Sequence, residues 1–167
     1  MAINKKVCML GPFAVGKTSL VRQFVHSMFS EKYQTTIGVK VDKKTLSVSG
    51  KTLNLMLWDI QGEDELHQIK VSYLRGAAGC LLVADGMRPE TLQAVLEIRR
   101  TVEAHVGPCP CILAVNKADR IEDWVVTDGE IASLKSEGWQ VIRTSAKTGE
   151  GVEDAFQQLS EMLLAEV

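Results

Sequence analysis

The segment GPFAVGKT, residues 11–18, has the residue types that would hold a chain of phosphates. It matches the pattern G-x-x-x-x-G-K-[ST] in full, between an apolar run and an amphipathic stretch. Gly11 and Gly16 allow the backbone to curl with its N–H groups facing inward, which makes a nest for anions. Lys17 supplies a positive charge for the terminal phosphates, and a helix that begins there adds its positive dipole end.

This cradle predicts the binding of a nucleoside triphosphate together with Mg²⁺. Thr18 offers a hydroxyl ligand to Mg²⁺, an ion that pairs with polyphosphate rather than with an all-protein cage. The alternative is a glycine-rich loop that only caps a helix, but the strand–loop–helix context favours the phosphate site. We expect Lys17 to act in catalysis and the nucleotide to contact this set of residues: Gly11, Ala14, Val15, Gly16, Lys17, Thr18 and Ser19.

Two later motifs indicate which base is bound. NKAD (116–119) follows the apolar run CILAV, and TSAK (144–147) overlaps the end of WQVIRT. The Asp119 carboxylate can accept hydrogen bonds from both N1–H and the 2-amino group of guanine. Adenine offers neither donor, so a buried carboxylate would lose its partners at a large cost in free energy. The order of the three motifs favours GTP, and an ATP-using phosphotransferase on the same cradle is the weaker alternative.

The elements that must position these motifs alternate along the chain. Continuous apolar runs predict strands at 6–11, 79–85, 111–116 and 139–144. Helical spacing predicts helices from Lys17 to about Met28, over 89–105 and over 151–167. Alternating leucines and valines on both sides of Ser49-Gly50 predict an antiparallel hairpin. Together these elements predict an α/β fold with a mostly parallel sheet. In such folds, ligands bind beyond the carboxyl ends of the strands.

Size and charge narrow the class of protein. The chain has 167 residues, which is the size of one domain, 1–167. Its net charge of −2 gives no broad basic field for nucleic acid. No apolar run is long enough to cross a membrane, and the final EMLLAEV has no cysteine for prenylation. We therefore expect a cytoplasmic protein with no direct membrane anchor, as a monomer or weak dimer.

The four cysteines suggest packing rather than chemistry. Cys8 and Cys80 lie inside apolar runs and are predicted to be small core residues. Cys109-Pro110-Cys111 does not have C-x-x-C spacing, and the sequence offers no neighbouring cluster that would complete a set of metal ligands. We therefore expect all four cysteines to have a structural role, in a protein of a reducing compartment.

In these motifs the chain resembles the Ras superfamily of small GTPases, and most closely its Rab-like branch. The resemblance covers nearly all residues and rests on this ordered series of segments: GPFAVGKT, TTIGV, WDIQGED, YLRGAAG, NKAD and TSAKTGEGV. It implies a P-loop NTPase G domain with a six-stranded, mostly parallel sheet, one antiparallel edge strand and about five helices. It also implies effector or regulatory proteins that bind through residues of about 30–75.

The resemblance assigns further residues to the nucleotide. Asn116 would hold the loops together, Lys117 would cover one face of the base, and the Ala146 backbone would meet the guanine oxygen, in a loop that includes Ser145 and Lys147. Phe29 would lie edge-on to the base, with core packing as its alternative. Tyr33 would cover the phosphates or bind a partner. The remaining assignments concern the third phosphate and its metal: Thr36 and Asp59 as Mg²⁺ ligands, Asp59 through water, and Gly62 as an N–H donor.

Two residues depart from the family pattern. Glu63 in DIQGED replaces the glutamine that orients the attacking water, and ionised glutamate only accepts hydrogen bonds. At about 4 Å and an effective dielectric near 20, it would be repelled by the phosphate by ~4 kcal/mol before relaxation. Gln61, two residues earlier, is the alternative water-orienting group. Phe13 occupies a position that is small in most relatives, and its ring should obstruct an arginine supplied in trans.

Two functions follow from these departures. The first is a switch that binds GTP or GDP with Mg²⁺, hydrolyses GTP slowly and docks partners only in the GTP state. The second is a GTP-binding module with negligible hydrolysis that acts as a constitutive interaction scaffold. The DIQGED segment is the feature that keeps the second function open.

Overall fold

Six strands form one sheet in the computed structural model, which describes residues 1–30, 38–60 and 70–165. Their order across the sheet is β2-β3-β1-β4-β5-β6. Within the described residues, β2 pairs with β3 in the antiparallel sense and all other neighbours are parallel. The bounds are β1 Ile3–Leu10, β2 Val39–Val48, β3 Lys51–Ile60, β4 Gly79–Asp85, β5 Cys111–Asn116 and β6 Val141–Arg143.

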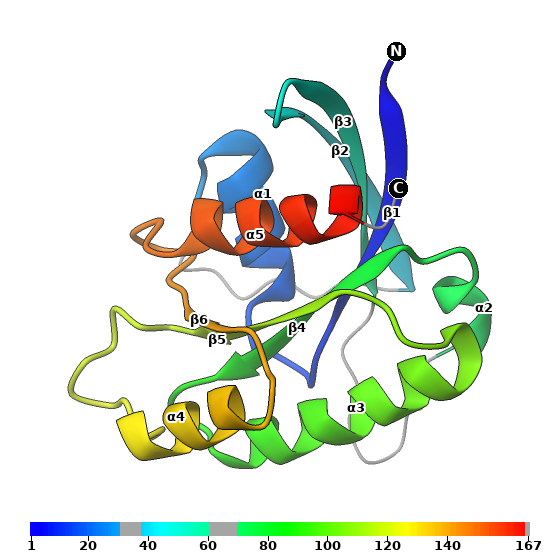
Figure 1. The fold of residues 1–167 in the computed structure, drawn as a ribbon. Helices are drawn as coiled ribbons and strands as arrows, with labels where there is room; N and C mark the ends of the chain where they lie inside the picture. Colours follow the sequence, from blue (N-terminus) through cyan, green and yellow to red (C-terminus); the bar gives the residue numbers. More distant parts are fainter. Residues whose placement is uncertain (31–37, 61–69, 166–167) are drawn as a thin grey trace.

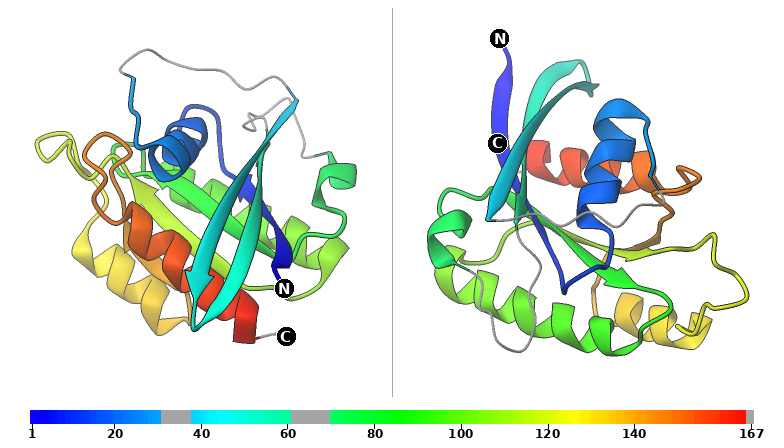
Figure 2. Two further views of the ribbon diagram at one scale, coloured as in Figure 1. Left: turned by 90° about the horizontal axis from the view of Figure 1, so that it is seen from above. Right: turned by 180° about the vertical axis from the view of Figure 1, so that it is seen from behind.

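Helices cover both faces of this sheet, as the alternation of elements predicts. Figure 1 shows α1 and α5 on one face and α3 and α4 on the other, and the two views in Figure 2 agree. The short α2 lies beside α3 at one side of the molecule (Figure 1). Their bounds are α1 Lys17–His26, α2 Val71–Leu74, α3 Glu90–Val106, α4 Asp128–Ser136 and α5 Val152–Ala165.

The two-residue period of strand side chains divides the core into two layers. In β1, Val7 and Met9 face the layer under α1 and α5, whereas Cys8 and Leu10 face the layer under α3. All four are buried, so the strand is apolar on both sides, as expected of a parallel sheet between helices. On the first face, the rings of Phe24 in α1 and Phe156 in α5 stack 3.9 Å apart. This contact fixes α1, and with it the loop that precedes α1.

The predicted hairpin is confirmed, and the predicted first helix is two residues too long. Ser49 and Gly50 form the turn between β2 and β3, both with positive φ, as a type I′ turn requires. Helix α1 ends at His26 because Ser27 adopts a left-handed conformation, with φ of 53°. Met28 therefore leaves the apolar stripe of the helix, and its side chain is exposed.

Helix α4 has no strong sequence periodicity, because Ile131 is its one buried residue. Its start is nevertheless encoded: Thr127 and Glu130 form a capping box, each accepting from the other's backbone N–H. The strand predicted over 139–144 is also shorter in the structure, since β6 pairs with β5 only through Val141–Arg143.

The position of β1 determines where a ligand can bind. β1 lies between β3 and β4 in the sheet. The connection from β1 to β2 runs towards one side of the sheet, and the connection from β3 to β4 runs towards the other. Such a switch point opens a crevice beyond the ends of the strands. The cradle of residues 11–18 occupies this point, between β1 and α1.

Candidate functional site: a nucleotide-binding edge of the sheet

Both glycines of the cradle are required by the space around them. Gly16 has φ of 103°, and a Cβ at this position would collide with the side-chain amide of Asn116. A Cβ on Gly11 would collide with the backbone carbonyl of Val83 in β4. The loop therefore lies tightly against β4 and against the end of β5, so the two glycines allow a close backbone approach as well as a turn.

Lys17 lies inside the loop rather than on the surface. Its side chain is buried, and its ammonium Nζ donates to the carbonyls of Gly11 at 2.9 Å and Pro12 at 3.1 Å. A buried ammonium next to inward-facing backbone suits a polyphosphate, since the positive charge is already desolvated and directed into the cradle. Of the other predicted cradle contacts, Val15 is buried and Ser19 is partly buried.

Thr18 and Asp59 form a pair of oxygen groups next to the cradle. The Thr18 hydroxyl donates to Asp59 Oδ2 at 2.6 Å, and Asp59 is buried in β3, where it pairs in register with Met9 of β1. A buried carboxylate and a hydroxyl beside a phosphate cradle suit Mg²⁺, which prefers oxygen ligands and shares them with phosphates. The donor set of the described residues therefore fits the predicted metal.

Asn116 connects three loops at the edge of the sheet. Its Nδ2 donates to the Val15 carbonyl at 2.9 Å, and its Oδ1 accepts from the Thr144 hydroxyl at 3.1 Å. The N–H of Ala118 also donates to the Thr144 carbonyl at 3.0 Å. Hydrogen bonds of the buried Asn116 side chain and of the Ala118 N–H thus join the cradle, NKAD and TSAK, which are far apart in sequence.

Asp119 is oriented by the TSAK loop. Its Oδ1 accepts from the Ser145 hydroxyl at 2.7 Å, and the same hydroxyl oxygen accepts from the N–H of Thr148 at 3.1 Å. Ser145 and Ala146 are buried, whereas Lys147 is exposed. This arrangement holds one oxygen of the carboxylate in place, which is the requirement for a base-reading group.

Lys117 joins the cradle to a residue that sequence reasoning missed, Asp85. Lys117 Nζ donates to the Ala14 carbonyl at 3.1 Å and lies 2.8 Å from Asp85 Oδ2. Asp85 also accepts from Arg88 Nε at 3.0 Å, and Arg88 Nη2 donates to the Phe13 carbonyl at 2.7 Å. A charged residue directly after the buried run GCLLVA, at the same edge as NKAD, is the signal that could have found this network.

The Asp85 carboxyl is held in its charged form. Burial raises its pKa, but hydrogen bonds from Lys117, the Met87 N–H and Arg88 outweigh burial, and the pKa lies below its ordinary value. A lowered folded-state pKa stabilises the fold above the pKa of the unfolded chain. That contribution is lost as the pH falls through the lower, folded-state pKa.

We expect Asp85→Asn to lower the free energy of unfolding by about 2 kcal/mol at neutral pH, since it leaves two cations without their buried anion. The value is below that of a fully buried pair because Lys117 and Arg88 are about one-third exposed. Denaturant titrations at several pH values would measure it, with Asp123→Asn, from an exposed pair with Arg120, as the matched control. The stability difference should shrink towards low pH, and a pH-independent difference would contradict this account.

The two phenylalanines of interest are both exposed. Phe29, just beyond α1, is 39% exposed, which argues against core packing and leaves it available to a ligand. Phe13 is 47% exposed at the cradle. Tyr33, Thr36, Gln61, Gly62 and Glu63 lie outside the described residues, so their predicted roles stay predictions.

Comparisons with known proteins show the family of this chain. A model of the Ras family matches residues 6–165. The chain belongs to the Ras family of small GTPases. It is Rab-like, being 34% identical to the human Ras-related protein Rab-32 over 95% of this chain and 74% of the relative. It is 32% identical to Ras-related protein Rab-4 of Dictyostelium discoideum, over 97% and 80%, and 32% identical to yeast SEC4, over 95% and 74%.

Membership of the Ras family confirms the fold and the class of reaction that the motifs predict for this Rab-like GTPase. The sheet and its helices form the P-loop G domain, and the protein is a GTP hydrolase. Members of the family bind guanine nucleotides and Mg²⁺ in general, and they act through effector and regulatory proteins. Among the helices of the described segments, none combines the length and apolar character needed to cross a membrane.

One expectation about cysteines needs correction. Cys8 and Cys80 are buried core residues, as expected. The expectation that no cluster of cysteines or histidines would form around Cys109 and Cys111 is wrong, because β4 brings Cys80 beside them, with the three sulfurs within 4.8 Å of one another. The sequence could not show this, because Cys80 is distant in the chain and adjacent only through the pairing of β4 with β5.

Proposed function

We propose that this Rab-like GTPase is a Mg²⁺-dependent switch that binds GTP and GDP, hydrolyses GTP slowly and binds partners in the GTP state through two switch segments, which contain TTIGV (35–39) and WDIQGED (58–64). The observation that supports it best is the hydrogen-bonded junction at Asn116. This residue ties the phosphate cradle to both base-reading loops. A single nucleotide could therefore contact all three loops at once.

The described residues would divide the binding of the nucleotide as follows. Asp119, held by Ser145, would accept from the guanine edge, and Phe29 would lie against the base. Lys17 and the cradle N–H groups would hold the phosphates. Thr18 and Asp59, with Thr36, would hold Mg²⁺, which when bound neutralises charge on the phosphate oxygens.

The slow rate is proposed from Glu63. A carboxylate at this position cannot donate a hydrogen bond, and it adds negative charge near the terminal phosphate. Gln61 is the alternative group for orienting water. At the cradle, the exposed Phe13 ring would obstruct an arginine from an activating protein, a contribution that can be worth ~10³ to 10⁵ in rate.

We expect Glu63→Gln to raise the rate of GTP hydrolysis at least about tenfold, which corresponds to ~1.4 kcal/mol of barrier. Single-turnover release of phosphate would measure the rate. Glu65→Gln, a change of the same kind two residues away, is the control and should leave the rate unchanged. A fast wild-type rate that no change at Glu63 or Gln61 alters would refute the proposal of slow hydrolysis.

A second function, a constitutive scaffold with negligible hydrolysis, rests on the same DIQGED segment. The nucleotide that stays bound to purified protein over hours distinguishes the two. Conversion of bound GTP to GDP supports the switch, and persistence of GTP supports the scaffold.

Partner binding is proposed for residues of about 30–75. The described part of this region contains two exposed apolar side chains, Val41 in β2, 44% exposed, and Val71 in α2, 43% exposed. Trp58 in β3 is half-buried under the Lys6 ammonium, 3.6 Å from the ring centroid, so it has mainly a packing role. These side chains would add apolar area to such a partner-binding surface.

A further inference from the structure

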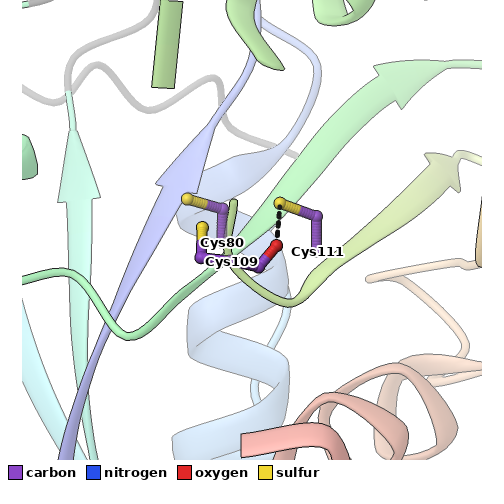
Figure 3. A group of neighbouring side chains, drawn as sticks. All are labelled: Cys80, Cys109 and Cys111. Atoms are coloured by element: carbon purple, nitrogen blue, oxygen red, sulfur yellow. Dashed lines mark hydrogen bonds between the residues drawn. The ribbon is translucent and has the colours of Figure 1, made fainter. Parts of the chain in front are cut away.

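Three of the four cysteines meet at the edge of the sheet opposite the nucleotide loops. Cys80 lies near the start of β4, Cys111 begins β5, and Cys109 lies two residues earlier in the connection from α3. Their sulfur atoms all lie within 4.8 Å of one another. Figure 3 shows the three side chains converging, with the Cys111 thiol 3.5 Å from the Cys109 carbonyl. All three are free thiols.

The backbone around these thiols is fixed. Cys80 and Cys111 are register partners in neighbouring parallel strands. The Cys80 N–H donates to the Pro110 carbonyl at 3.0 Å, so the Cys-Pro-Cys segment is bonded to β4. A Cβ on Gly79 would lie 2.9 Å from that same carbonyl, which shows how closely the two segments pack. The sheet thus brings Cys80 and Cys111 together, and the hydrogen bond to the Pro110 carbonyl holds the segment of Cys109 against β4.

The size and composition of the cluster suit a thiophilic metal ion. Three sulfurs that bind one tetrahedral ion at about 2.3 Å lie ~3.8 Å from one another, so only small side-chain shifts are needed here. The cluster consists of thiols alone, which excludes Mg²⁺ and Ca²⁺ and selects ions of the Zn²⁺ class or softer.

A divalent ion would leave the cluster with little net charge. Three thiolates with a divalent cation have a net charge of −1, and the Arg99 guanidinium, whose charge acts on Cys109, is shared with Glu103 at 3.0 Å. Cys109 is also the least buried of the three, which gives an ion a route to the site.

We propose that Cys80, Cys109 and Cys111 form a three-thiolate site for a thiophilic divalent cation of the Zn²⁺ class. Binding releases three thiol protons and forms three metal–sulfur bonds, with no change of oxidation state. A fourth position stays open to water on the side of Cys109. The bound ion connects β4 to β5 at the edge away from the nucleotide and stabilises the fold by the free energy of binding.

The test uses the whole chain, reduced with a phosphine and stripped of metal by a chelator. Titration with Cd²⁺ should produce a thiolate-to-metal charge-transfer band that saturates at one ion per chain. Zn²⁺ should compete for the same site and raise the midpoint of thermal unfolding. Replacement of Cys80, Cys109 or Cys111 by alanine should weaken binding about 100-fold or more, because each removes a metal–sulfur bond.

Cys8→Ala is the matched control. Cys8 is the register partner of Cys80 in β1 and equally buried, but its thiol lies 3.6 Å from the Tyr73 carbonyl, outside the cluster, so the affinity should not change. Reduced wild-type protein that binds no Cd²⁺ would overturn the proposal, and this measurement needs no variant. Undiminished binding by Cys109→Ala would overturn it as well. Cys109 is only half-buried, so this variant is the least disruptive of the three to the fold.

Discussion

Replacement of Asp119 by asparagine is expected to lower the affinity for GTP and GDP by about 10³-fold, roughly 4 kcal/mol. The carboxylate can accept from both guanine donors, whereas an asparagine amide presents one acceptor and a competing donor. The Ser145 hydroxyl, 2.7 Å from Asp119 Oδ1, holds the carboxylate in place before any ligand arrives. Isothermal titration with each nucleotide would measure the loss.

The same variant makes a second, opposite prediction. Xanthine has an oxygen at the position of the guanine amino group, so the amide of Asp119→Asn can donate to it. Affinity for xanthosine triphosphate should therefore rise as affinity for GTP falls. Asp123→Asn removes an equal charge from the same loop at an exposed position and should change neither affinity. Equal losses for both nucleotides would show that Asp119 stabilises the loop instead of recognising the base.

Replacement of Lys17 by alanine is expected to weaken GTP binding by about 10³-fold, because it removes the buried ammonium that we propose as the partner of the phosphates. The ammonium already lies within hydrogen-bonding distance of the Gly11 and Pro12 carbonyls, so its position is set by the loop. Lys17→Arg should also fail, since a guanidinium is larger and planar and does not fit the place of a compact ammonium. Filter binding with labelled GTP would measure both variants.

The control for Lys17 is Lys51→Ala, an exposed lysine at the start of β3 beyond the hairpin turn. It removes the same charge far from the cradle and should leave GTP binding intact. A Lys17→Ala protein that keeps wild-type affinity would place the phosphates elsewhere and contradict the assignment of the cradle.

The strands and the main helices could be predicted because their signals are local. Continuous apolar runs, the Ser49-Gly50 turn and the stripe of α5 each encode an element within a few residues. The predicted end of α1 is two residues too late. Met28 has the spacing and hydrophobicity of the helical stripe, but Ser27 in the left-handed conformation ends the helix before it. Periodicity alone cannot detect such a stop.

The candidate site could be predicted in outline for a similar reason. GPFAVGKT, NKAD and TSAK are short motifs at strand ends, so the topology alone brings them to one edge. The resemblance assigns Asn116 to holding the loops together, but the partners that each link joins could not be predicted. The contact of Asn116 with Val15, the network of Asp85 with Lys117, and the meeting of Cys80 with Cys109 join residues distant in sequence. They depend on which strands are neighbours in the sheet.

The most direct test of the account is calorimetry of the purified protein with Mg²⁺ and four nucleotides, GDP, GTP, ADP and ATP. The account predicts one site per chain, with guanine nucleotides bound at least about 100-fold more tightly than adenine nucleotides. Equal affinity for the guanine and adenine forms would contradict it, because Asp119 would then not read the base.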